Sequence, residues 1–226
     1  MKTFLVVPDM QVPYHDDGFL NALYQIIEDS KPDEILIVGD ELDAPEPSRW
    51  SRGYASEYAR TLQKSINQCH DILSCFRESL GDGAIHLMRS NHGERIQKYV
   101  SKYAPALASL ESLEYQQLLR LDDIGVTYHD KPYEFANGFV LAHGDEGSQA
   151  RYASGTALNL AKKWNKSVVC GHTHKAGMAH HHSYLNNKAS SLLYGIEVGH
   201  AMSMNKAGYL SAGSADWRQA FAFIRA

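Results

Sequence analysis

Short apolar runs alternate along this chain with longer stretches in which apolar residues recur at helical spacing. The runs TFLVVPD (3–9) and DEILIVGD (33–40) each end in an aspartate, as is typical of strands buried on both faces. Between them lies a pattern that predicts an amphipathic helix ending before Pro32, with its apolar face formed by Phe19, Leu20, Leu23, Ile26 and Ile27.

The same alternation continues further along the chain. Residues 54–80 have a second helical pattern, which ends at GDG (81–83), and AIHLMRSN (84–91) reads as a third strand. This β-α-β-α-β order predicts an α/β fold with parallel strands at its centre. Ligands of such sheets bind beyond the carboxyl ends of the strands.

Length and composition narrow the class of protein. A chain of 226 residues, 44% hydrophobic and 21% charged, is predicted to form a single globular domain over residues 1–226. The net charge of −4 gives no overall basic footprint for nucleic acid. Three cysteines without a close pair indicate reduced thiols, and the N-terminal apolar run is too short for a signal peptide, so we expect a cytoplasmic protein without membrane association.

Polar residues that can bind metals follow five predicted strands, which are the three above and the runs GFVLAHGD (138–145) and KSVVCGHTH (166–174). Further strands are predicted at GVTYHD (125–130), LYGIEVGH (193–200) and DWRQAFAFIRA (216–226). Each candidate taken alone has an ordinary explanation as a turn or capping residue, but separate loops have no reason to repeat one ligand chemistry at one structural position. The candidates that we expect to meet at one edge are Asp9, Gln11, Asp40, Asp43, Asn91, His92, His143, His172 and His174.

This set of side chains suits a pair of divalent metal ions. Carboxylate, amide and imidazole ligands without thiolates favour manganese, with iron, zinc, cobalt or nickel as alternatives. Two such ions about 3.5–4 Å apart need a shared carboxylate and a shared solvent molecule that supplies hydroxide near neutral pH. Asp40, in the middle of the set, is the predicted bridge.

At this point the sequence resembles the calcineurin-like metallophosphoesterases. The motif series of that family is D-x-H, G-D-x-x-D/N, G-N-H-E/D, H-G and G-H-x-H, and the similar segments here, in the same order, are DMQ, GDELD, SNHGE, AHG and GHTH. Small members encoded by phages and prophages are the most similar, through runs such as GDELDAPEPSRW, NHGERIQKYVSKYAPAL and DWRQAFAFI. The resemblance implies a four-layer α/β/β/α sandwich of two mixed sheets flanked by helices.

The resemblance also implies a role for each candidate. It assigns Asp9, Gln11, Asp40 and His174 to the first metal, and Asp40, Asn91, His143 and His172 to the second. His92 would protonate the leaving oxygen or hold a phosphate oxygen, with Asp43 orienting it. The implied enzyme is a dinuclear metal-dependent phosphoric ester hydrolase that attacks a phosphate mono- or diester with a metal-bridging hydroxide.

Two departures from the family pattern stand in the motifs themselves. Gln11 replaces the family's histidine with a neutral and weaker ligand. Ser90 and Gly93 replace the flanking glycine and acid of G-N-H-E, and Glu94, one residue later, is a candidate substitute for that acid.

Several alternatives remain open from the sequence. The same chemistry would serve a nuclease or a cyclic-nucleotide phosphodiesterase, so a nucleotide or nucleic acid is among the candidate substrates, and the oligomeric state is open. A metal-binding protein that has lost turnover is the alternative from another class, supported by the changes at Gln11 and Gly93. Arg49 and Arg95 are candidate phosphate clamps, His15 is as well explained by a turn, and the histidines 180–182 are predicted to be solvated.

Overall fold

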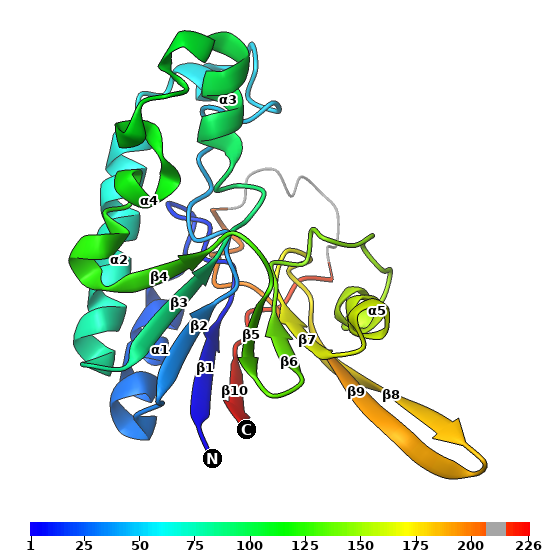
Figure 1. Cartoon of the computed structure of the whole chain (residues 1–226). Coiled ribbons are helices and arrows are strands. Elements are labelled where there is room, and N and C mark those ends of the chain that lie inside the picture. Colours follow the sequence, from blue (N-terminus) through cyan, green and yellow to red (C-terminus); the bar gives the residue numbers. More distant parts are fainter. Residues whose placement is uncertain (207–215) are drawn as a thin grey trace.

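Two five-stranded β-sheets pack face to face in the computed structural model, which describes residues 1–206 and 216–226 (Figure 1). The first sheet has the order β10-β1-β2-β3-β4, in which β1 to β4 are parallel and β10 is an antiparallel edge. Its strands are β1 (Thr3–Val7), β2 (Glu34–Ile37), β3 (Ala84–Met88), β4 (Val126–His129) and β10 (Ala222–Arg225).

The second sheet has the order β5-β6-β7-β9-β8. Strands β6, β7 and β9 are parallel, and β5 and β8 pair antiparallel at the two edges. The strands of this sheet are β5 (Tyr133–Ala136), β6 (Phe139–Leu141), β7 (Ser167–Cys170), β8 (Ala176–Leu185) and β9 (Lys188–Val198). The hairpin of β8 and β9 extends away from the rest of the molecule (Figure 1).

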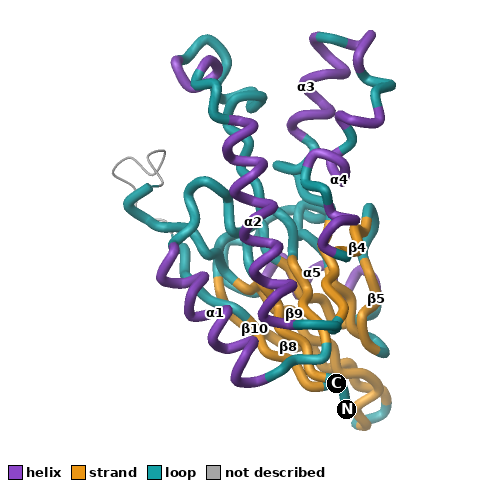
Figure 2. The backbone as a smooth tube through the Cα atoms, turned by 90° about the vertical axis from the view of Figure 1, so that its left-hand side faces the viewer, coloured by secondary structure: helices purple, strands orange, loops and turns teal. Residues whose placement is uncertain are grey.

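Helices cover the outer faces of both sheets. In Figure 2, α1 and α2 lie in front of the first sheet, while α5 packs on the second. The α-helices are α1 (Asp17–Ser30), α2 (Leu62–Leu80), α3 (Arg95–Tyr103), α4 (Tyr115–Leu118) and α5 (Gly155–Trp164). Four short 3-10 helices are η1 (Ala55–Tyr58), η2 (Pro105–Leu107), η3 (Glu111–Leu113) and η4 (Leu121–Ile124).

Three clusters of buried apolar side chains join the two sheets and the two layers of helices. One joins the first sheet to α1 and α2, and includes Leu5, Ile35 and Leu23. The middle one lies between the sheets, where the rings of Phe4 and Phe135 meet edge to face at 5.0 Å. The third joins α5 to the second sheet. The predicted α/β/β/α sandwich of two mixed sheets is therefore confirmed.

The first helix and most strands appear where the apolar pattern predicted them. Helix α1 begins after Asp16, whose side chain accepts a hydrogen bond from the Phe19 amide at 2.9 Å. The second helix was predicted too long: its pattern began at residue 54, but α2 starts at Leu62. The reason is Arg60, whose left-handed backbone (φ 56°) interrupts the helical path after η1.

The C-terminal segments were predicted less well. The run 216–226 is a strand only over β10, and β5 and β8 were not predicted. The histidine run was predicted as a solvated strand or loop, and it lies in strand β8 with His180 and His182 exposed. All three cysteines are free, and among the described helices none has both the length and the apolar character to span a bilayer.

Candidate metal centre

The loops after five strands meet at the carboxyl edge of the two sheets. These loops follow β1, β2 and β3 in the first sheet and β6 and β7 in the second, and they converge in Figure 1 above the strands. They bring together all nine residues that the sequence singled out: Asp9, Gln11, Asp40, Asp43, Asn91, His92, His143, His172 and His174. Most of these side chains are buried, so the edge forms a polar site inside the protein.

Asp40 lies at the centre of this site. Its Oδ2 accepts a hydrogen bond from Gln11 Nε2 at 3.0 Å, and its Oδ1 lies 3.4 Å from His143 Nε2. Oδ1 also accepts from the His92 amide at 3.2 Å. Burial raises the pKa of this carboxyl, but the imidazoles of His92 and His143 outweigh burial and hold the pKa well below its usual value. Asp40 is therefore a carboxylate that faces both halves of the site.

One half of the site contains Asp9, Gln11 and His174. His174 Nε2 lies 3.2 Å from Asp9 Oδ2 and 3.4 Å from Gln11 Nε2. Asp9 Oδ1, Gln11 Oε1 and His174 Nδ1 are buried without a hydrogen-bond partner among the described residues. Buried polar atoms are costly when unsatisfied. Two unsatisfied oxygens beside an imidazole fit a cation in this half of the site.

The other half contains Asn91, His143 and His172. One ligand atom each from Asp40, His143 and His172 all lie within 4.8 Å of one another. His143 Nδ1 donates to the carbonyl of Val38 at 2.9 Å, which leaves Nε2 facing Asp40 and Asn91 Oδ1, the latter at 2.9 Å. A backbone acceptor on one ring nitrogen is how metal-binding histidines are usually oriented. This half also fits a divalent cation.

Proton binding competes with metal binding at His143. Burial lowers the pKa of this imidazole, but the Asp40 carboxylate outweighs burial and raises the pKa to about 10. At His172, burial and then His143 lower the pKa, so this ring is neutral. A cation that binds His143 must displace a proton, because an imidazolium cannot coordinate a metal.

Close backbone approaches explain two glycines of the motifs. A Cβ on Gly171 would come within 2.0 Å of Asp9 Oδ1, so only glycine lets the β7 loop lie against Asp9. Gly39 has φ 98°, and a Cβ there would meet Ser90 Cβ at 2.7 Å. Both glycines allow neighbouring loops to bring their ligands within reach of each other.

His92 lies at the rim of the site with two charged neighbours. Its Nδ1 is 3.0 Å from Asp43 Oδ1, within ion-pair distance although poorly aligned for a hydrogen bond. Its Nε2 accepts a hydrogen bond from Arg95 Nη2 at 2.7 Å, and Arg95 also donates to the Asp43 carbonyl. Of the two candidate clamps, Arg95 therefore contacts the predicted catalytic pair directly, while the Arg49 guanidinium lies over the Trp50 ring.

The Tyr115 ring occupies the space beside Gly93, the position where the third motif of the family has an acid. A Cβ on Gly93 would come within 3.1 Å of the Tyr115 ring, whose hydroxyl donates to buried Glu41. Burial raises the pKa of Glu41 to about 7. Glu94 does not replace the missing acid, because its carboxylate pairs with Arg89 at 3.0 Å and Lys98 at 2.6 Å.

Two supporting features were not predicted from the sequence. His200, beside Asp9 through a β-bridge, is fully buried with an unpartnered Nε2 among the described residues, and its ring centre lies 5.5 Å from that of His174. Burial and then His174 lower its pKa to about 4. Arg89 makes a bidentate contact with Asp145, at 2.7 and 2.9 Å, which braces the loop after β6. No motif indicated a role for His200 or for the Arg89–Asp145 pair. A signal was present, because His200 and Asp145 each follow an apolar run, as the predicted ligands do.

His15 has a structural role. Its Nε2 lies 3.2 Å from Asp17 Oδ1, at the start of α1, and 3.4 Å from Gln68 Nε2 on α2. Burial lowers its pKa. His15 therefore has the structural role, in the turn before α1, that the sequence left open.

Comparisons with solved structures give distant similarities. Vps29 of Entamoeba histolytica, solved in complex with zinc, is 12% identical with a TM-score of 0.47, covering 99% of this chain and 86% of that one. Vps29 of Cryptosporidium parvum is 15% identical with a TM-score of 0.44, covering 98% and 83%.

Comparisons of sequence give closer relatives. No family model matches the chain. The Gene 54 protein of Mycobacterium phage L5 is 34% identical over 228 residues, which cover 99% of this chain and 88% of the relative. The Gene 54 protein of Mycobacterium phage D29 is 31% identical over 226 residues, with the same coverage of each chain. Because this similarity extends over nearly the whole chain, the protein belongs to the family of these Gene 54 proteins.

Proposed function

We propose that this protein is a metal-dependent phosphoesterase that hydrolyses a phosphate mono- or diester, acting as one domain over residues 1–226. One observation carries the proposal: five loops from both sheets gather buried carboxylate, amide and imidazole ligands around Asp40, with unsatisfied oxygens on Asp9 and Gln11. Such a cluster is costly to bury without a cation. The three free cysteines fit a cytoplasmic location.

The ligands divide into two sets that share Asp40. Two divalent ions, with manganese favoured, would lower the pKa of a shared water and neutralise charge on the phosphoryl oxygens. Oxygen and nitrogen donors without thiolates suit manganese, and also iron, zinc, nickel and cobalt. The first set is Asp9, Gln11, Asp40 and His174, and the second is Asp40, Asn91, His143 and His172.

His92, Asp43 and Arg95 would handle the leaving group and the substrate phosphate. With Nδ1 facing Asp43, His92 presents Nε2 to the site, where a proton can pass to the leaving oxygen. Arg95 occupies Nε2 in this structure, so it must turn aside before His92 can donate. A phosphate oxygen arriving beside Arg95 is a better partner for the guanidinium than an imidazole, and would draw it away.

Hydrolysis of two nitrophenyl esters tests this proposal. Protein stripped of metal with a chelator should not cleave bis-p-nitrophenyl phosphate or p-nitrophenyl phosphate, and added Mn²⁺ should restore cleavage of at least one. Iron, zinc, cobalt and nickel complete the panel. Failure to cleave either ester with any metal would overturn the phosphoesterase and leave the alternative, a metal-binding protein without turnover.

A Gln11→His variant tests the first metal position. The Gln11 amide lies between Asp40 and His174, and its Oε1 has no partner among the described residues. Imidazole is the better donor for borderline ions, so the Co²⁺ concentration that gives half-maximal activity should fall about 10-fold. Gln63→His, the same change on the exposed face of α2, is the control and should behave as wild type. An unchanged or higher metal requirement would mean that Gln11 does not bind the metal.

A further inference from the structure

A groove lies directly beside the candidate metal centre. It has a volume of about 380 Å³, within the usual range for ligand pockets, and is formed by the loop 47–52 and one side of α3. Two of its lining residues belong to the candidate site, since Asn91 is a predicted ligand of the second metal and Arg95 contacts His92. A molecule that lies in the groove therefore has one end at the predicted point of cleavage.

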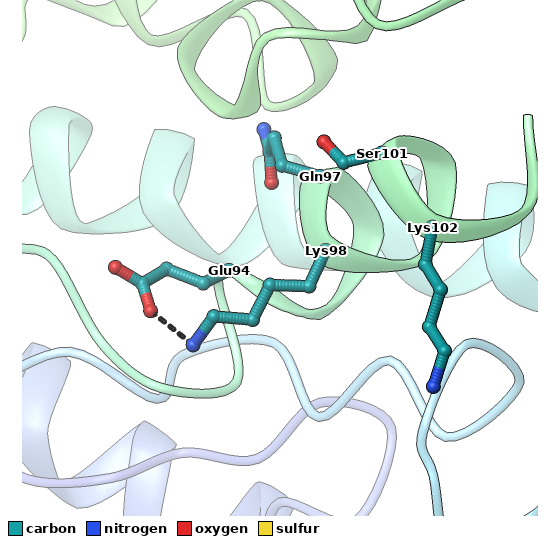
Figure 3. Close-up of a pocket in the computed structure, with 5 residues that line it drawn as sticks. All are labelled: Glu94, Gln97, Lys98, Ser101 and Lys102. Atoms are coloured by element: carbon teal, nitrogen blue, oxygen red, sulfur yellow. Dashed lines mark hydrogen bonds and ion pairs between the residues drawn. The ribbon is translucent and has the colours of Figure 1, made fainter. Parts of the chain in front are cut away.

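The groove concentrates positive charge in a protein that is acidic overall. Five cations line it: Arg49, Arg52, Arg95, Lys98 and Lys102. Figure 3 shows Lys98 and Lys102 extending from the same side of α3, away from Gln97 and Ser101, with Lys98 paired to Glu94.

Three of these cations have no ion-pair partner in the part of the chain that the structure describes. In residues 1–206 and 216–226, the ion pairs include Lys98 with Glu94 and Arg95 with Asp43, but none involves Arg49, Arg52 or Lys102. Glu57 is the one acid among the described residues that line the groove. Its carboxylate accepts a hydrogen bond from the Gly53 amide at 2.7 Å and forms no ion pair with these cations. Unneutralised cations that line one groove are the usual footprint for a phosphate backbone.

Exposed aromatic rings alternate with these cations. Trp50 is 73% exposed and Tyr103 is 44% exposed. The Arg49 guanidinium lies 4.6 Å from the Trp50 ring, and Arg52 lies 5.1 Å from the Tyr103 ring. Stacking of unpaired bases on aromatic rings, combined with basic residues along the backbone, is the common mode of single-strand binding.

We propose that this groove binds a single strand of nucleic acid and places one of its phosphodiesters at the metal centre. The inference rests on the proposed phosphoesterase and names its substrate class. In the reaction the oxygen of one water forms a new P–O bond as one ester P–O bond breaks, which leaves a phosphomonoester on one fragment. The leaving oxygen of the other fragment takes a proton from His92 and becomes a hydroxyl. Cations alone would suit any phosphate, whereas exposed rings favour unpaired bases over the bases of a duplex.

Binding of a labelled oligonucleotide to the full chain in Mn²⁺ tests the groove. Fluorescence anisotropy with a phosphorothioate single strand of about 12 nucleotides measures affinity while hydrolysis is slow. The double variant Trp50→Ala, Tyr103→Ala should bind about 10-fold or more weakly, because stacking on two rings is lost. Arg52→Ala with Lys102→Ala should also weaken binding, and should reduce the slope of log affinity against log salt by about 1.4.

The control variant removes one aromatic and one basic side chain at a site far from the groove. Tyr184→Ala with Lys188→Ala, at the end of the β8–β9 hairpin, should bind as wild type. Wild-type affinity in both groove variants, or tighter binding of the matching duplex, would overturn the groove proposal. Cleavage of bis-p-nitrophenyl phosphate is measured separately. If the groove variants bind the oligonucleotide weakly but the wild type does not cleave this ester, the phosphoesterase proposal is overturned. If the wild type cleaves the ester but the groove variants bind normally, only the groove proposal is overturned.

Discussion

Asp40→Asn is expected to lower kcat/KM for a nitrophenyl ester more than about 100-fold, because one carboxylate serves both halves of the metal site. An amide keeps the shape of the side chain but removes the negative charge and one anionic oxygen. Asparagine also tolerates the left-handed backbone at this position (φ 51°), so the variant should fold. The loss should therefore come from the site and not from the fold.

The same change at an exposed carboxylate is the matched control. Asp71 lies on the exposed side of α2, and Asp71→Asn should keep both activity and thermal stability. Activity within a few-fold of wild type in Asp40→Asn would show that Asp40 is not a shared ligand.

His92→Ala is expected to lower kcat by about 10²–10⁴-fold while both metals stay bound. The contact from position 92 to Asp40 Oδ1 is made by the backbone amide, which alanine keeps. The imidazole itself contacts Asp43 and Arg95, and its Nε2 lies 3.7 Å from Asp40 Oδ2, beyond hydrogen-bond distance. Its proton helps most where the leaving oxygen is a poor leaving group, so an alkyl ester should lose much more rate than a nitrophenyl ester.

His182→Ala, at an exposed histidine of β8, is the control for this variant and should match wild type on both esters. Metal loss from His92→Ala would make His92 a ligand. An equal loss of rate on both esters would mean that His92 stabilises charge in the transition state and is not an acid.

The central part of the fold could be predicted because its strands are buried on both faces. Strands such as β2, with four buried residues in a row, read as continuous apolar runs, and the polar residue at the end of each run marks the carboxyl edge. Strands at the edges have no such pattern. In β8, polar and histidine residues face solvent, so the pattern around residues 180–182 fits a solvated strand and a loop equally well and does not predict a ten-residue strand.

The ligand set could be predicted from local motifs, but the contacts around it could not. Arg95 follows His92 by three residues on the first turn of α3, and only the structure shows that its guanidinium reaches the imidazole. The replacement of an acid by Gly93 depends on the Tyr115 ring, which comes from a distant segment. Contacts of this kind are set by packing between elements, which a single sequence does not show.

Elemental analysis of wild type and Asp40→Asn, after equilibration with Mn²⁺ and removal of unbound metal, tests the dinuclear centre most directly. Asp40 faces Gln11 on one side and His143 on the other, so its loss should disturb both sets of ligands together. A shared Asp40 predicts two manganese ions per chain in the wild type and close to none in the variant. A variant that retains one full equivalent, or a wild type that never binds more than one ion, would contradict it.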